Sequence, residues 1–341
     1  MIYVGMDVSS KSFVIHALNE RKKLVWKGEI EPTREGLRKL MRDLGKETKL
    51  VVFEAGNQMK WIAETLKKIE GVHVHVVHPN EVKWINQSSG KTDKVDAKKL
   101  AELARGDLLP RKVHVVEGAV RELRELVSAR DQLLRKRVAL INTLRGYVKQ
   151  EGQRLPAKFF QGELWKERLG RLPLSRPLKL IIESFQASIE ALRDSEIEIT
   201  RRILEIEDKR IDLLESIPGI GKLTSRVLVG AIDEVKRFDG KKALAKYGAL
   251  TPRIYQSGEV TQLGRINRDG RHEVRGMLLQ CAHTVGRMKT AGSKPLREFY
   301  ERIERRRGKK IAVVALARKL LTTSYGVLKS GTMYDPAKLA A

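Results

Sequence analysis

The spacing of apolar residues changes from a strand pattern to a helical pattern near residue 119, and this change divides the chain. Short segments rich in β-branched residues predict strands over 2–8, 12–18, 23–30, 49–54 and 72–77. Helical spacing lies between them over 34–44 and 59–69, and again from Val95 to a stop signal at Gly106. Three successive strands followed by alternating helices and strands predict a mixed α/β sheet covered by helices.

Beyond residue 119 the apolar positions repeat every seven residues, which is typical of long amphipathic helices. The first set comprises Val120, Val127, Leu134, Ile141 and Val148. A second set, with steps of four and three, runs from Leu178 to Leu213, and a segment containing Pro and Gly separates the two over 151–177. This periodicity fits either a coiled coil that dimerises or a hairpin within one chain, and it does not distinguish them.

The charge of the chain indicates a polyanionic partner, and nucleic acid is the expected one. The 341 residues carry a formal net charge of +26, of which residues 1–118, with 22 basic and 16 acidic residues, contribute only +6. Hydrophobic residues make up 41%, enough for real cores, and the 5% of aromatic residues does not favour a module built on base stacking. The single cysteine, Cys281, excludes an internal disulfide framework, and we expect this residue in a helical core. We expect the protein to be soluble, cytoplasmic and nucleoid-associated.

Four carboxylates stand where a metal-dependent reaction would need them. Asp7 and Glu54 end two apolar strands, and Asp93 and Asp96 lie three residues apart in the segment KTDKVDAKKL. A two-metal site for phosphoryl transfer requires carboxylates at the ends of central strands and on one helix, because Mg²⁺ takes oxygen ligands. Taken singly, each carboxylate also has a plainer interpretation, as a turn residue, a helix cap or a solvated side chain.

The basic half contains further candidate contacts to nucleic acid. The turn IPGIG predicts a helix-hairpin-helix element in which Gly219, Gly221 and Lys222 approach a phosphate, and a simple turn between two helices fits as well. The stretch 248–271 is predicted to be rich in loops, and two helices at about 272–289 and 309–329 are predicted to finish the chain. The candidate phosphate-binding arginines are Arg253, Arg265, Arg268, Arg271 and Arg275.

Two motifs resemble those of one family. In the order of its four carboxylates and in the motif K-T-D-x-x-D-A, the chain resembles the DEDD transposases of bacterial and archaeal insertion sequences, relatives of the Piv-type DNA invertases. It also matches the family's P-x-x-x-x-S-G…L-G-R-I motif, which puts the family's nucleophilic serine at Ser257. The resemblance implies a RuvC-like domain of RNase-H fold over 1–118, a helical coiled-coil dimerisation region over 119–215, and a mainly helical C-terminal transposase domain over 216–341.

The resemblance further implies a recombinase that cuts and rejoins donor and target DNA through a covalent phosphoserine link at Ser257. The four carboxylates would bind Mg²⁺, or Mn²⁺ in its place, and a non-coding bridge RNA would select the DNA. The protein would act as a homodimer, or as a tetramer on DNA. The residues alone leave two alternatives open: a RuvC-like junction resolvase that uses water as the nucleophile, and a nucleic-acid-binding protein without catalysis.

Overall fold

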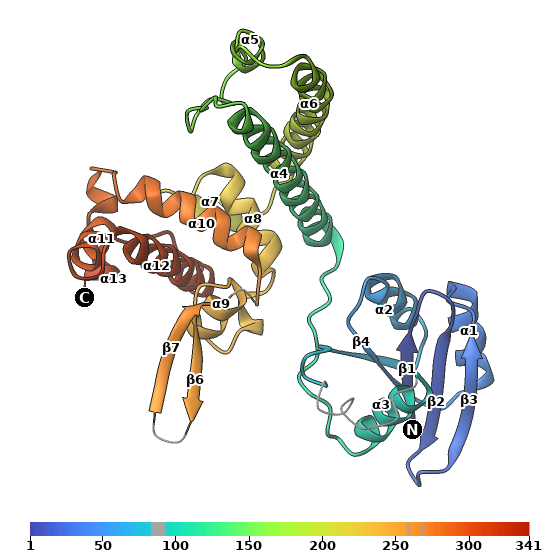
Figure 1. Ribbon diagram of the computed structural model, residues 1–341. Helices are drawn as coiled ribbons and strands as arrows, with labels where there is room; N and C mark the ends of the chain where they lie inside the picture. Colours follow the sequence, from blue (N-terminus) through green and yellow to red (C-terminus); the bar gives the residue numbers. More distant parts are fainter. Residues whose placement is uncertain (83–92, 258–259, 268, 341) are drawn as a thin grey trace. The chain divides into compact units, whose positions relative to one another are not determined.

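The computed structural model describes residues 1–82, 93–257, 260–267 and 269–340 (Figure 1). The chain forms two compact units, Met1–Val115 and Val116–Ala341. The first is a mixed α/β unit and the second is largely helical, which confirms the prediction from the apolar spacing. The regions predicted over 119–215 and 216–341 both fall in the second unit, and their division into separate domains stays a prediction.

The sheet of the first unit has the strand order β3-β2-β1-β4-β5. Its strands are β1 (Ile2–Val8), β2 (Phe13–Asn19), β3 (Leu24–Ile30), β4 (Lys49–Glu54) and β5 (Val72–Val77). The first three strands are antiparallel neighbours, whereas β4 pairs in parallel with both β1 and β5. Parallel strands need crossover connections, and helices supply them here.

Helices cover both faces of this sheet, and they are α1 (Arg34–Asp43), α2 (Met59–Lys67) and α3 (Asp93–Arg105). The first two pack on one face, where Met6 and Phe53 are buried in the main core of the unit. α3 packs on the other face, where Leu100 lies in one cluster with Val52. Because successive strand residues point to opposite faces, the α3 face carries the odd-numbered residues of β1 and the even-numbered residues of β4.

The two heptad stretches form a helical hairpin within one chain. α4 (Gly118–Gln150) and α6 (Arg176–Glu205) pack against each other, and the short helix α5 (Trp165–Gly170) lies between them in the sequence. Trp165 of α5 is buried in the same cluster as Leu144 of α4. Of the two arrangements compatible with the spacing, the hairpin is therefore observed, and a dimer through these helices stays a prediction.

A buried ion cluster specifies how α4 and α6 align. Glu196 of α6 is 8% exposed, and it accepts hydrogen bonds from Arg130 at 2.9 Å and from Arg137 at 2.8 and 3.0 Å. The same Arg130 donates to the Thr200 hydroxyl, one helical turn further on, at 2.8 Å. Breaking a buried ion pair leaves an uncompensated charge, so a slip of one helix along the other is disfavoured.

The predicted second long helix breaks where the chain enters the C-terminal core. Ile206 has a ψ of 123°, which ends α6, and a new helix begins at Arg210. The remaining elements are α7 (Arg210–Glu215), α8 (Lys222–Ile232), η2 (Val235–Arg237), α9 (Lys241–Tyr247), β6 (Pro252–Ser257), β7 (Val260–Ile266), α10 (His272–Val285), η3 (Ala291–Ser293), α11 (Lys294–Arg307), α12 (Lys309–Ser330) and α13 (Ala337–Ala340).

Two predictions for this half were wrong. Much of the stretch 248–271 is not loop, because β6 and β7 pair as an antiparallel hairpin. A further helix, α11, lies between the two helices predicted to finish the chain, with Leu296 and Tyr300 buried. Charged residues occupy most of α11, so its apolar stripe is narrow and gives a weak periodic signal.

Helix α12 is, among the described residues, the one helix that is long and apolar enough to cross a membrane. The central helix of a soluble core passes the same test of length and composition. In this structure Ala312, Leu316 and Leu320 of α12 are fully buried in the core of the second unit. We therefore interpret α12 as a core helix.

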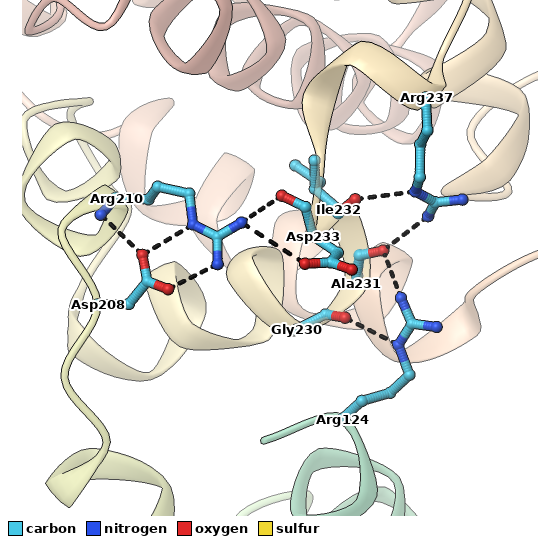
Figure 2. A network of polar contacts seen from close by, with 8 residues as sticks. All are labelled: Arg124, Asp208, Arg210, Gly230, Ala231, Ile232, Asp233 and Arg237. Carbon is cyan, nitrogen blue, oxygen red and sulfur yellow. Dashed lines mark hydrogen bonds and ion pairs between the residues drawn. The ribbon is translucent and has the colours of Figure 1, made fainter. Parts of the chain in front are cut away.

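Three arginines from different elements bind the carboxyl end of α8 (Figure 2). Arg124 of α4 and Arg237 of η2 donate to backbone oxygens of residues 230–232 at 2.9–3.1 Å. Arg210 of α7 donates to the backbone oxygen of Asp233. The last carbonyls of a helix have no partner inside it and carry partial negative charge, so guanidinium groups stabilise them. These bonds tie α4 to the C-terminal helices.

Candidate functional site

The first two predicted carboxylates end neighbouring strands on the same face of the sheet. In the parallel pair of β1 and β4, Met6 lies opposite Phe53, so Asp7 and Glu54 are the next residues at the same edge. Both positions belong to the face that α3 covers. Each side chain is half-buried. The prediction from the strand pattern alone, that these two residues share an edge, is confirmed.

A close approach between β1 and α3 sets the position of the third carboxylate. A Cβ added at Gly5 would lie 2.0 Å from the backbone oxygen of Ala97 and 2.6 Å from the backbone nitrogen of Ala101. The helix backbone therefore rests directly on the strand, two residues before Asp7. Asp96, which precedes Ala97, is carried to this face of the sheet. Only glycine leaves room for such contact.

The carboxylate of Asp96 has one unsatisfied oxygen. This carboxylate is half-buried, and the Oδ1 atom is buried without a hydrogen-bond partner. A buried carboxylate oxygen without a partner is costly, and Mg²⁺ would satisfy it because this ion prefers oxygen ligands. Helix α3 begins at Asp93, so one helix carries both predicted aspartates, but the Asp93 side chain lies outside the described part of the structure.

The described side chains alone do not complete a metal site. Among them, no group of three or more His, Cys, Asp or Glu residues is arranged to hold a metal ion. The residues present nevertheless suit a hard divalent cation. They supply carboxylate oxygens on one face of the sheet, and one of these oxygens, Oδ1 of Asp96, has no hydrogen-bond partner. The assignment of Asp7, Glu54, Asp93 and Asp96 as metal ligands stays a prediction.

Replacing Gly5 with alanine should displace α3 from the sheet. The added methyl group would meet helix backbone, which cannot move aside as a flexible side chain can, and we expect a loss of roughly 3 kcal/mol in unfolding free energy. Urea denaturation measures this loss. The matched control is Gly56→Ala, since a Cβ at Gly56 meets nothing within 4 Å and should change stability by less than about 0.5 kcal/mol. Equal effects of the two substitutions would contradict the close packing of α3.

A buried histidine that was not predicted as a site residue lies on the same face. His16 of β2 lies opposite Gly5, is 7% exposed, and has an Nδ1 atom without a partner. Burial, together with the positive charges of Lys27 and Lys98, lowers the pKa of His16 and favours its neutral form. A histidine inside the apolar strand FVIHAL was the available signal.

The predicted serine lies at the end of a β-hairpin in the second unit. Ser257 is the last residue of β6 and pairs with Val260 of β7, and the intervening Gly258 and Glu259 lie outside the described residues. Of the side chain of Ser257 itself nothing is described. An aromatic residue that was not predicted as a site residue, Tyr255, lies two positions before it and is 58% exposed.

The arginines around this hairpin differ in their surroundings. Arg253 and Arg265 are exposed on β6 and β7, whereas Arg268 lies outside the described residues. Arg271 contacts Glu273 at 3.0 Å, and its Nε donates to the Tyr247 hydroxyl at 3.2 Å. Arg275 donates to the backbone oxygen of Asn267 at 3.4 Å. These last two arginines therefore have a structural role at the base of the hairpin, and phosphate binding by any of the five stays a prediction.

Tyr247 stands at the centre of this basic cluster and was also missed. Burial of the phenol opposes ionisation, but the charges of Arg271, Arg124 and Arg237 outweigh it and lower the pKa of Tyr247. The guanidinium of Arg237 lies 4.6 Å from the centre of the Tyr247 ring. Three guanidinium groups thus surround Tyr247, and the same groups bind the carbonyl oxygens at the end of α8 and the carboxylate of Glu273.

The two glycines of the IPGIG turn have different surroundings. Gly219 has a φ of +84°, and a Cβ there would lie 2.3 Å from Val285 of α10, so this glycine is required for packing. Gly221 caps α8 with open space around its Cα, and Lys222 is exposed beside it. The amino end of α8 is thus accessible, and a phosphate contact at this turn stays a prediction.

Cys281 is buried in the nearby core, as expected, and burial raises the pKa of its thiol.

Comparison with known proteins gives matches along most of the chain. A family model described as "Transposase" matches residues 4–152, and one described as "Transposase IS116/IS110/IS902 family" matches residues 211–301. The chain is 26% identical over 327 residues to the "Transposase for insertion sequence element IS1111A" of Coxiella burnetii, covering 93% of this chain and 86% of that protein.

Two other relatives extend this likeness. A "Probable family 20 transposase" of Pseudomonas aeruginosa is 24% identical over 350 residues, which covers 98% of each chain. The "Pilin gene-inverting protein" of Moraxella bovis is 37% identical over 129 residues, 37% of this chain and 39% of that protein. Transposase models match residues 4–152 and 211–301, and the carboxylates and the serine fall inside these ranges. The chain therefore belongs to the IS116/IS110/IS902 family of transposases and is a DNA transposase.

Proposed function

We propose that this transposase cuts and rejoins DNA through a covalent link between Ser257 and a DNA phosphate. Asp7, Glu54, Asp93 and Asp96 would hold divalent metal, Mg²⁺ or Mn²⁺, in a domain of RNase-H-like fold. A non-coding RNA would select donor and target DNA. A bound metal would stabilise the charge that develops on phosphate oxygens during the displacement.

The observation that carries the proposal is the parallel pairing of β1 with β4 beneath α3. It supports a metal-binding role because Asp7 and Glu54 end adjacent strands and Gly5 allows α3 to carry Asp96 onto the same face. The unsatisfied Oδ1 of Asp96 adds support. The RNase-H-like interpretation is supported by the order of elements, with three antiparallel strands followed by parallel strands and helices.

The chemistry proposed for Ser257 balances in two displacements. In the first, the serine Oγ bonds to phosphorus, the serine loses its proton, and the bond from phosphorus to one deoxyribose oxygen breaks as that oxygen takes up a proton. In the second, the oxygen of a hydroxyl on another strand bonds to phosphorus and loses its proton, while the bond from phosphorus to the serine Oγ breaks and the serine takes up a proton. The exposed Arg253 and Arg265 lie on the strands that carry Ser257 and would stabilise the phosphate charge.

Support for the macromolecular partners comes from charge and from exposed apolar side chains. The net charge of +26 is concentrated beyond residue 118 and suits the backbones of DNA and RNA. A homodimer, or a tetramer on DNA, would use the exposed apolar residues of the α4–α6 hairpin. These residues are Val138, Leu180, Ile197 and Leu204, which are 43%, 62%, 57% and 37% exposed.

The proposal is tested with the full-length protein, its supercoiled donor plasmid and RNA transcribed from the DNA flanking the gene. With Mg²⁺ we expect a protein–DNA adduct that survives detergent, and with EDTA we expect none. Adding Mn²⁺ after EDTA should restore the adduct. Cleaved ends without an adduct would instead identify a resolvase-like nuclease that uses water. An adduct that forms equally well in EDTA would contradict the metal site.

A further inference from the structure

A cavity of about 270 Å³ lies in the second unit among α9, α12 and the segment that leads into α13. Its walls include Lys241, Lys319, Thr323, Val327, Tyr334 and Lys338. Pockets for small ligands span roughly 300–1,000 Å³, so this cavity is close to the lower limit of that range and suits a ligand no larger than one nucleotide. It is separate in sequence from the carboxylates and from the hairpin that carries Ser257.

The cavity gathers positive charge. Lys241, Lys319 and Lys338 line it, against the single carboxylate of Asp335. In the described part of the chain, none of the three lysines forms an ion pair. Burial lowers the pKa of Lys319, and the nearby charges of Lys241 and Arg302 lower it further. Like charges held together repel unless an anion joins them, so the cavity is arranged for an anion.

A buried hydroxyl in the wall has no partner. Thr323 is 9% exposed, and its Oγ1 is buried without a hydrogen bond. The hydroxyls on either side of it in the sequence are satisfied by their own helix, since Thr322 donates to the backbone oxygen of Lys319 and Ser324 donates to that of Leu320, both at 2.9 Å. Thr323 is therefore the member of this run that is left for a ligand.

The remaining wall is apolar and can pack against a sugar or a base. Val327 is buried, Tyr334 is half-buried, and Met333 is 64% exposed at the edge. The Tyr334 hydroxyl donates to the backbone oxygen of Gly292 at 3.1 Å, which holds the ring in place. Cations, one unsatisfied hydroxyl and an apolar surface together match the three parts of a nucleotide.

We propose that this cavity binds one unpaired nucleotide of a nucleic-acid strand. Lys319 and Lys241 contact its phosphate, Val327 and Tyr334 pack against its sugar or base, and the Thr323 hydroxyl bonds a polar atom of the same group. The proposal rests on the action of this protein on nucleic acid, but not on the serine chemistry. DNA and RNA strands share this chemistry, and the experiment separates them.

The test uses photocrosslinking of the full-length protein. Single-stranded oligonucleotides of DNA or of RNA carry one photoreactive iodinated uracil, and mass spectrometry identifies the peptides they reach. We expect crosslinks in the segment that contains Met333 and Tyr334. Whether the DNA oligonucleotide, the RNA oligonucleotide or both of them crosslink shows which kind of strand the cavity binds. No crosslink in residues 331–338 with either probe would overturn the proposal.

Two substitutions sharpen this test. Thr323→Val should weaken the crosslink about fivefold, the effect of one lost hydrogen bond, while raising the melting temperature because an unsatisfied hydroxyl is removed. Thr322→Val is the matched control and should leave the crosslink unchanged, because its hydroxyl is already satisfied.

Lys319→Gln should reduce the slope of log affinity against log salt concentration by about 1. Wild-type crosslinking in both Thr323→Val and Lys319→Gln would show that the cavity does not bind the strand.

The test is independent of catalysis. A Ser257→Ala protein, which is expected to form no adduct, should give the same crosslinks in residues 331–338. The crosslinks therefore test the cavity even if Ser257 is not the nucleophile. Conversely, a cavity that binds no strand would leave the proposed role of Ser257 unaffected.

Discussion

Ser257→Ala is expected to abolish the detergent-resistant adduct and to reduce recombination by about 10⁴-fold or more, because the variant lacks the hydroxyl that is proposed to form the covalent link to phosphate. The measurement follows labelled donor DNA through a denaturing gel, with Mg²⁺ and the flanking RNA present. Ser257 is the last residue of β6, next to the turn of the hairpin, so replacing it with alanine should not reduce the free energy of unfolding.

The matched control for this substitution is Gln262→Ala, since Gln262 is exposed on the partner strand β7 of the same hairpin. It should retain the adduct. If Ser257→Ala still forms an adduct, the nucleophile is a different residue, and the family's serine motif does not carry over to this chain. Loss of folding in both variants, seen by circular dichroism, would instead show that the hairpin itself is sensitive.

Asp96→Asn is expected to reduce adduct formation by about 10³-fold, because the amide keeps the shape of the side chain but is a much weaker ligand for a divalent cation. Its effect on stability should have the opposite sign. The wild-type Oδ1 is buried without a partner, so removing the charge should maintain or raise the free energy of unfolding without metal. Activity assays and urea denaturation in EDTA measure the two effects separately.

The control for Asp96→Asn is Glu102→Gln on the same helix, since the Glu102 side chain is 49% exposed and its ion pair with Lys98 lies at the surface. This variant should keep nearly full activity. Mg²⁺ should raise the melting temperature of the wild type and of Glu102→Gln, but not that of Asp96→Asn, because only a folded protein with a complete site gains binding energy. A wild-type response to Mg²⁺ in Asp96→Asn would remove this residue from the metal site.

Local pattern predicted most of the first unit. Strands such as 49–54 and 72–77 are short, β-branched and bounded by turn residues, and they form where predicted, because burial and propensity favour the same state. The two strand-end carboxylates, Asp7 and Glu54, were recognisable for the same reason. A charged residue at the end of an apolar strand interrupts a pattern that burial would otherwise continue.

The second unit was harder to predict because long-range packing decides it. The β6–β7 hairpin was missed, since residues 252–266 are rich in Arg, Gly and polar residues and give little alternation of apolar positions. The break at Ile206 was missed because apolar spacing continues through it in the sequence, whereas the chain turns there to enter the C-terminal core. Helix α11 was missed because its charged residues outnumber its apolar ones.

The sequence by itself determined the identity of the chemical groups, the change from sheet to helix near residue 119, and the family that the chain resembles. Tertiary structure alone decided which groups come together. Gly5 reads as one glycine in a strand, yet it allows the backbone of α3 to lie directly on β1, on the face of the sheet that carries Asp7. Likewise, heptad spacing allowed a dimer or a hairpin, and the pairing of Glu196 with Arg130 and Arg137 is made within one chain. The physical reason is that periodicity records which side of an element is buried, whereas its partner is selected by steric fit and charge pairing between residues far apart in the sequence.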